Sequence, residues 1–251
     1  MTRDVDQHVA DLRDGGERLA VAVGRVDPDT AIPSCPDWTA RDLARHTGGV
    51  HRWATLHVAE ARTDLVDDDL DTLVGGWPAD EALPGWLRDG VERLADALAQ
   101  APADLDCVTF LPAPSPRAFW ARRQAHETTI HRVDAEQAGG GVTPIDPALA
   151  ADGVDELLFG FAARPGKLRD DGARVLHLHA DDVGTDWTVR VGPDGGGAEV
   201  GAPARADCYV SASAADVYLL LWNRRTAEGL DVEGDATLLA DWSRRLRVRW
   251  S

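Results

Sequence analysis

Two residues in the middle of the chain, Glu127 and His131, have the types and the spacing of metal ligands. They lie four positions apart in residues 125–134, which have the sequence Ala-His-Glu-Thr-Thr-Ile-His-Arg-Val-Asp. Positions i and i+4 of an α-helix face the same side, one turn apart, so this carboxylate and imidazole could hold one metal ion. The alternative is an exposed charge pair that adds only about 0.2–0.5 kcal/mol to helix stability.

A third candidate ligand is His46. Thr39 and Asp42 have the spacing of a helix N-cap with an approximate capping box, so a helix is expected to begin there. The stripe of this helix that is expected to face inward contains Leu43, His46, Val50, Trp53 and Leu56 or His57. Facing helices of a bundle can combine Glu and His ligands in this way. Two histidines and one carboxylate with open positions form a catalytic zinc pattern, and the same set suits Fe(II) or Ni(II).

Other reactive side chains have weaker patterns around them. Asp134 follows His131 by three residues and could accept the other ring N–H of that histidine, or could be an exposed aspartate. Cys35 has no basic neighbour in the sequence and is expected to be a structural thiol. The chain has no Gly-x-Ser-x-Gly, P-loop or Gly-x-Gly-x-x-Gly motif, and the run Gly195–Gly197 is expected to form a hairpin turn.

The remaining histidines are not expected to bind metal. His51 and His126 lie on helix faces that are offset from the candidate ligands. The others lack a motif and are expected to be surface or strand-packing residues: His8, His57, His177 and His179.

Helical periodicity dominates the first half of the chain. It predicts four helices: residues 4–27, a segment that begins at Thr39, residues 82–100, and residues 116–137. Gly48 and Gly49 weaken the second helix, and we expect them where a backbone or a ligand comes close. Residues 62–78 and 101–117 are expected to be irregular. Four helices joined by loops predict an up-down bundle.

The second half has a mixed pattern, so the fold class is α+β. Three glycines at 139–141 mark the end of the bundle, and the predicted domains are residues 1–142 and 143–251. Helices are expected at 147–163, 214–225 and 236–246. Strands are expected at 174–180, 187–191 and 207–211, with a short strand or turn at 230–235.

The net charge, the apolar runs and the cysteines of the chain indicate which partners and locations to expect. The 251 residues carry a net charge of −17, which disfavours binding to nucleic acid or to an anionic membrane. There is no apolar run of about 20 residues and no apolar segment near the N-terminus, so a cytoplasmic location is expected. The three cysteines form no CxxC motif, which favours reduced thiols.

Three segments in order resemble the mycothiol-dependent maleylpyruvate isomerase family. The first runs from Pro-Ser-Cys-Pro-Asp-Trp-Thr at residue 33 through His46 to Gly-Val-His-Arg-Trp at 49–53. The second is residues 122–136, and the third is Leu-Trp-x-Arg at 221–224 with Gly-Leu-x-Val-Glu-Gly-Asp at 229–235. The resemblance implies a DinB-like metal-binding four-helix bundle followed by an α+β domain similar to sterol-carrier folds.

The resemblance also implies the chemistry. It implies that His46, Glu127 and His131 are the ligands of a catalytic divalent metal, typically zinc. It also implies that mycothiol is the thiol cofactor or co-substrate. Arg224 becomes a candidate for binding an anionic substrate or the cofactor, with a surface arginine as the alternative. The expected function is thiol addition to, or transfer onto, a small electrophile by an isomerase or S-transferase. The expected oligomeric state is a monomer or homodimer.

Two alternative functions stay open. The bundle could bind a metal or a small ligand without turnover, as a regulatory module. It could also be a different metal hydrolase, for which His51 is the candidate general base.

Overall fold

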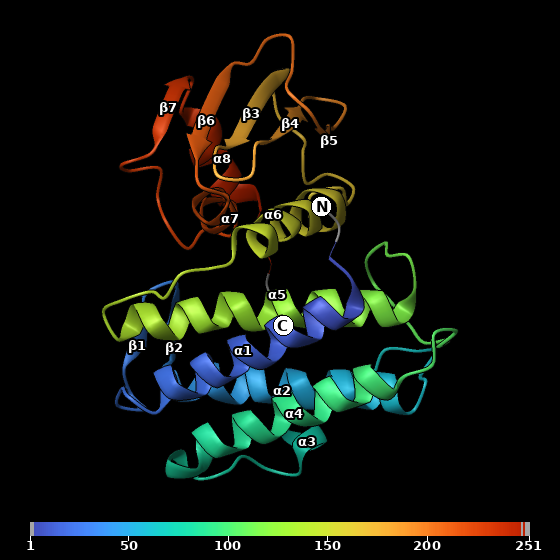
Figure 1. Ribbon diagram of the computed structural model, residues 1–251. Coiled ribbons are helices and arrows are strands. Elements are labelled where there is room, and N and C mark those ends of the chain that lie inside the picture. Colours follow the sequence, from blue (N-terminus) through green and yellow to red (C-terminus); the bar gives the residue numbers. More distant parts are fainter. Residues whose placement is uncertain (1–2, 247, 249–251) are drawn as a thin grey trace. The chain divides into compact units, whose positions relative to one another are not determined.

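A computed structural model describes residues 3–246 and residue 248. Within them the chain forms two compact units, residues 3–143 and the part from residue 144 onward. The N-terminal unit is a helical bundle with a small hairpin, and the C-terminal unit combines helices with a β-sheet (Figure 1). The fold is therefore α+β, as the sequence predicts. None of the described helices is long and apolar enough to cross a membrane.

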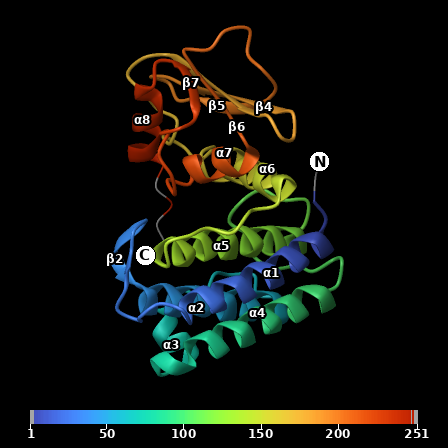
Figure 2. The same cartoon turned by 60° about the vertical axis from the view of Figure 1, so that its left-hand side comes forward.

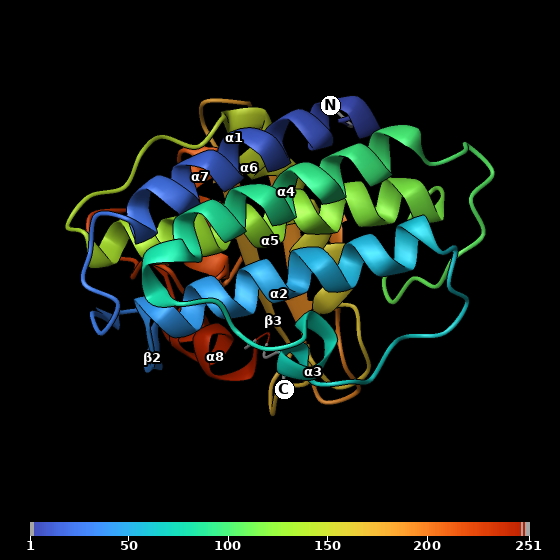
Figure 3. The ribbon, with the colours of Figure 1, turned by 90° about the horizontal axis from the view of Figure 1, so that it is seen from below.

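Four long helices build the N-terminal unit, and Figure 3 shows them running alongside one another. They are α1 (Val5–Val23), α2 (Ala40–Ala59), α4 (Leu83–Gln100) and α5 (Pro116–Ala138). Helix α1 packs against α4 and α5, and α2 packs against the same two helices. The predicted bundle is confirmed, although α1 ends at Val23 and not near residue 27.

The helix starts follow the capping residues in the sequence. Thr39 accepts a hydrogen bond from the backbone N–H of Asp42, whose carboxylate accepts one from the N–H of Thr39. The predicted capping box is therefore confirmed. Ser115 caps α5 in a similar way, and Gly139 ends it. These local contacts place His46 in the second turn of α2 and Glu127 in the middle of α5.

Glycines let the helices approach closely. A Cβ on Gly48 would lie 2.1 Å from a ring carbon of Trp86, and one on Gly49 would lie 3.0 Å from Leu70. Our expectation that a backbone or a ligand lies against these glycines was wrong, because side chains of neighbouring helices fill the space. Helix α1 continues through Gly15 and Gly16 because Val91 of α4 packs against Gly16.

Some short elements lie in segments without a predicted regular structure. The hairpin of β1 (Ala31–Ile32) and β2 (Cys35–Thr39) precedes α2. Helix α3 (Leu70–Val74) lies in the acidic loop, and a 3₁₀ turn (Asp80–Ala82) leads into α4. These elements are too short for a periodic pattern to emerge.

The C-terminal unit is built on a five-stranded sheet in the order β5-β4-β3-β6-β7. Its strands are β3 (Arg174–Ala180), β4 (Thr185–Val191), β5 (Gly197–Val200), β6 (Cys208–Ala212) and β7 (Asp231–Gly234). Strand β3 pairs antiparallel with β4 and parallel with β6. Strand β5 was not predicted, and the glycines before it form the predicted turn from β4.

Three helices belong to this sheet unit, as Figure 2 shows. They are α6 (Pro147–Glu156), which a π-helical turn extends to Phe161, α7 (Ala214–Leu221) and α8 (Thr237–Arg245). Helix α7 is shorter than the predicted 214–225. Alternate residues of β3, Leu176 and Leu178, are buried, whereas His177 and His179 are on the opposite face. This alternation is the one that the sequence predicts for a sheet with one covered face.

Candidate metal centre

Helix α5 carries an unusual buried segment. Each residue from Arg123 to Glu136 is buried, and more than half of these side chains are polar or charged. Buried polar groups are costly unless each has a partner. The hydrogen-bond and ion-pair partners of these buried side chains therefore show how the centre of the bundle is organised.

The three predicted ligands lie together at this centre. Nε2 of His131 lies 3.1 Å from Oε1 of Glu127, and Nε2 of His46 lies 3.4 Å from the same oxygen. The candidate ligand atoms of all three residues lie within 4.8 Å of one another. Helix α5 supplies Glu127 and His131 one turn apart, and α2 supplies His46 across the bundle. Two imidazoles and one carboxylate that converge in this way could hold a divalent cation.

The other oxygen of Glu127 has its own partner. The Arg123 guanidinium donates a hydrogen bond of 2.8 Å to Oε2 of Glu127, and both side chains are buried. This contact leaves Oε1 directed at the two imidazoles. Sequence analysis did not single out Arg123, although it lies four residues before Glu127 and shares its helix face.

His131 is oriented by a second carboxylate. Its Nδ1 lies 3.0 Å from Oδ2 of Asp134, so Nδ1 carries the proton and Nε2 remains available as a ligand. Asp134 is fully buried, which excludes the alternative that it is an exposed aspartate. The Ser34 hydroxyl donates a hydrogen bond of 2.5 Å to the other oxygen of Asp134. Ser34 lies 100 residues away in the sequence and was not predicted to take part.

An aromatic side chain covers the two imidazoles. The Trp38 ring lies with its centroid 4.7 Å from that of His46 and 6.0 Å from that of His131. Trp38 is only half-buried, and the side chain of His46 keeps 11% of its surface exposed. The site is therefore enclosed on the bundle side and bordered by an indole ring near the solvent.

Charges around the site favour a cation. Burial alone would make His131 harder to protonate, but the carboxylates of Glu127 and Asp134 outweigh it and raise the pKa of His131 to about 9. Burial would likewise raise the pKa of Glu127, but His131, His46 and Arg123 hold it well below its ordinary value. Burial lowers the pKa of His46, although Glu127 partly offsets this effect. Two carboxylates against one arginine thus favour positive charge where the ligand atoms meet.

His51 is buried near the site but has a different role. Its Nε2 lies 2.9 Å from the hydroxyl of Thr128, and burial lowers the pKa of His51 to about 3. His51 is fully buried and already pairs with a threonine, and its lowered pKa makes it a weak base, so it does not fit the general base required by the hydrolase alternative.

Two histidines contradict the prediction that they lie at the surface. His57 is fully buried: its Nδ1 donates to the backbone oxygen of Trp53, and its Nε2 accepts from the N–H of Val66. His8 is buried in α1, with its ring edge-on to that of His126 at 5.9 Å. His57 satisfies both of its ring nitrogens inside the bundle, so the polarity of a histidine on a helix stripe did not indicate exposure.

The two strand histidines lie on the open face of the sheet. His177 and His179 both lie within hydrogen-bonding distance of one oxygen of Asp186, at 2.7 and 3.0 Å. Both are half-buried on a strand, which agrees with the prediction that they are surface or strand-packing residues.

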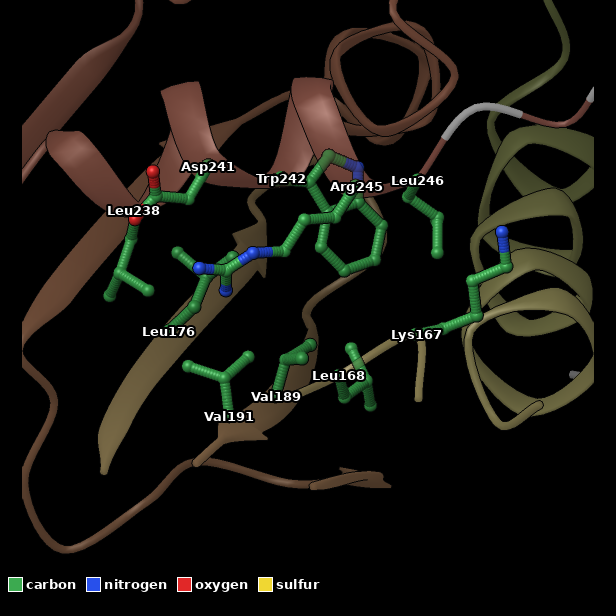
Figure 4. Close-up of a pocket in the computed structure, with 10 residues that line it drawn as sticks. All are labelled: Lys167, Leu168, Leu176, Val189, Val191, Leu238, Asp241, Trp242, Arg245 and Leu246. Carbon is green, nitrogen blue, oxygen red and sulfur yellow. The ribbon is translucent and has the colours of Figure 1, made fainter. Parts of the chain in front are cut away.

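Arg224 lies in the C-terminal unit, just after α7. Its guanidinium donates a hydrogen bond of 2.8 Å to the backbone oxygen of Trp222. A pocket of the same unit lies between the sheet and α8, and Figure 4 shows its mainly aliphatic walls. Arg224 is not among the residues that line this pocket. Arg245 does line the pocket, and its guanidinium forms an ion pair with the carboxylate of Asp170 at 3.0 Å.

The fold and the site together define a class of protein: a helical bundle with a buried His-Glu-His cluster, joined to an α+β unit. Comparison with family models places the chain within this class. The model described as "Mycothiol maleylpyruvate isomerase N-terminal domain" matches residues 9–136, and "MDMPI C-terminal domain" matches residues 148–241. The chain belongs to the mycothiol maleylpyruvate isomerase family, as the sequence motifs predict.

Solved structures agree with this assignment. The crystal structure of a mycothiol-dependent maleylpyruvate isomerase has a TM-score of 0.65 and 18% identity, over 94% of this chain and 98% of that one. A histidine-to-alanine mutant of a mycothiol-dependent maleylpyruvate isomerase has a TM-score of 0.64 at the same identity and coverage. At this identity the likeness shows a shared fold. No curated protein sequence matches the chain.

Proposed function

We propose that this protein is a metal-dependent enzyme that activates a low-molecular-weight thiol, mycothiol, for addition to or transfer onto a small electrophile. The observation that carries the proposal is the convergence of Nε2 of His46, Oε1 of Glu127 and Nε2 of His131 within 4.8 Å. The printed descriptions of the family models and of the related structures support the thiol. Zinc is the expected metal because two histidines and one carboxylate form a common catalytic zinc set.

Each side chain has a distinct task in this proposal. His46, Glu127 and His131 would hold the metal, while Arg123 keeps Oε2 of Glu127 occupied so that only Oε1 faces the site. Asp134 holds the proton on Nδ1 of His131, so Nε2 presents its lone pair. When bound, a divalent cation lowers the pKa of a coordinated thiol, so that thiolate is available near neutral pH.

An aromatic side chain shapes access to the ligand cluster. Trp38 borders the two imidazoles with an apolar surface, which excludes water from one side of the ligand cluster. Arg224 of the C-terminal unit would bind an anionic substrate or the thiol. The reaction class, isomerisation or S-transfer, depends on whether the thiol leaves again after it adds.

The test combines metal analysis with turnover. Purified protein is expected to contain about one zinc per chain and to transform conjugated electrophiles only when mycothiol is present. His46→Ala should lose both metal and turnover, because it removes one of three ligands. His177→Ala, a histidine of the sheet, is the matched control and should retain both.

Two outcomes would contradict the proposal. A His46→Ala protein with full metal content and full turnover would exclude this cluster as the site. A native protein that binds zinc but transforms no electrophile with mycothiol would instead be a non-catalytic metal-binding module.

A further inference from the structure

The short hairpin β1–β2 contacts the candidate metal centre from outside the bundle. Its two strands are joined by Pro33 and Ser34, and the second strand runs directly into the N-cap of α2. Ile32 of the hairpin is fully buried in the core cluster of the bundle. The backbone N–H of Ala40 also bonds to the carbonyl of Thr30 at 2.8 Å. The hairpin is thus held rigidly on the same helix that carries His46.

One contact of this hairpin reaches a ligand through a carboxylate. The Ser34 hydroxyl donates to Oδ1 of Asp134 at 2.5 Å, and Oδ2 of Asp134 lies 3.0 Å from Nδ1 of His131. Asp134 is completely buried, so the direction of its carboxylate depends on the donors around it. A hydrogen bond to one oxygen restricts rotation of the group and thereby places the other oxygen.

A second contact comes from the same hairpin. Trp38 of β2 lies over the rings of His46 and His131. Ser34 and Trp38 therefore approach the two imidazoles from one small element. That element lies between α1 and α2 in the chain and packs against both α2 and α5, the two helices that carry the ligands.

We propose that Ser34 is a positioning residue, which acts through Asp134 to hold His131 in the orientation required for metal binding. The inference rests on the proposed function only in requiring that the cluster binds a metal. Removal of a side chain that hydrogen-bonds a metal ligand typically lowers metal affinity about 10–100-fold. Here the outermost hydrogen-bond donor is Ser34 of the hairpin, which contacts Asp134, and Asp134 in turn contacts the candidate ligand His131.

The experiment measures metal binding without turnover. Metal-free protein is titrated with Co(II), whose visible absorption reports the geometry of its ligands. Ser34→Ala is expected to weaken Co(II) binding about tenfold, the lower end of the range for such partners, and to shift the absorption bands. Ser34→Thr keeps the hydroxyl and is expected to restore both readouts.

A matched control separates positioning from general stability. Ser115→Ala removes the N-cap of α5, the helix that carries Glu127 and His131. Ser115 lies 12 residues before Glu127 in the sequence. This variant should lower the midpoint of urea denaturation yet leave Co(II) affinity and absorption unchanged, because an N-cap stabilises its helix without touching the ligands.

A double-mutant cycle tests the route through Asp134. If Ser34 acts through Asp134, Ser34→Ala should have no further effect on Co(II) binding in an Asp134→Asn background. Equal Co(II) affinity and spectra for Ser34→Ala and the native protein would overturn the inference and leave the proposed metal site standing. Absence of Co(II) binding by the native protein would overturn both. Ser34→Gly, which suits a turn, repeats the measurement if the alanine variant does not fold.

Discussion

Helices α4 and α5 belong to the same bundle but bury opposite kinds of side chain. Helix α4 has one apolar face, with Leu83, Leu87, Val91, Leu94 and Leu98 buried and charged residues on its other side. Helix α5 is buried continuously from Arg123 to Glu136, with charged groups at its centre. An apolar stripe stabilises a helix by removing surface from water. A buried ion pair gives no such clear gain, because the desolvation cost offsets the attraction.

The difference suggests that α4 mainly stabilises the bundle, whereas the centre of α5 carries the candidate metal site. The buried leucines of α4 stabilise the core of the bundle. The buried charges of α5 are retained at a cost in stability, which agrees with a functional site at that point. Changes in α4 should therefore reduce stability alone, and changes in the centre of α5 should alter both stability and metal binding.

The largest effect is expected for Glu127→Gln. Arg123 would stay buried but lose the carboxylate of Glu127 as an ion-pair partner, and removal of one partner of a buried pair costs about 3–5 kcal/mol. Urea denaturation of the metal-free protein measures the loss, and metal analysis should find no bound zinc. The exposed Arg13–Glu92 pair is the control: Glu92→Gln should cost less than about 1 kcal/mol. Equal losses for the two variants would show that burial does not distinguish these pairs.

Leu87→Ala should lower stability without loss of the site. Leu87 is fully buried, and truncation of such a leucine costs about 2–5 kcal/mol. Zinc content per folded chain should stay at the native value. Loss of metal from a variant that is still folded would contradict the division of tasks between α4 and α5.

Stability of the metal-free protein should fall as pH rises from about 6.5 to 9. An unfolded histidine loses its proton near pH 6.5, whereas His131 keeps its proton until about pH 9 because two carboxylates stabilise it. Its contribution is therefore complete below pH 6.5 and disappears as pH rises through 9. We expect a loss of about 1–3 kcal/mol, measured by urea denaturation across this range. His131→Gln should remove most of the slope, and an unchanged slope would contradict the assignment.

A loss of similar size is expected where α1 and α4 come into close contact. Gly→Ala within a helix ordinarily stabilises it by about 1 kcal/mol, but a Cβ on Gly16 would lie 2.4 Å from a methyl group of Val91. Gly16→Ala should therefore destabilise the protein by about 1–3 kcal/mol. Gly85 in α4 has open space around it, so Gly85→Ala should be neutral or stabilising. Thermal denaturation distinguishes the two, and the same sign for both would show that α1 can move away from Val91.

Much of this architecture could be predicted because it depends on local spacing. Helical periodicity indicated the four long helices, and Thr39 with Asp42 located the start of α2. Glu127 and His131 approach each other through the i to i+4 geometry of one helix. The family motifs and the inward stripe of α2 added His46. Short elements such as α3 and β5 escaped prediction because a few residues cannot establish a period.

Contacts between distant segments could not be derived from spacing. The hydrogen bond from Ser34 to Asp134, the position of Trp38 over the imidazoles and the burial of His8 and His57 all depend on how separate elements pack. Each requires a side-chain direction that only the packed bundle selects. The sequence alone therefore determined the four long helices of the bundle and the three candidate ligands. Tertiary structure alone decided which groups orient those ligands, because hydrogen bonds between elements form only once the core has closed around them.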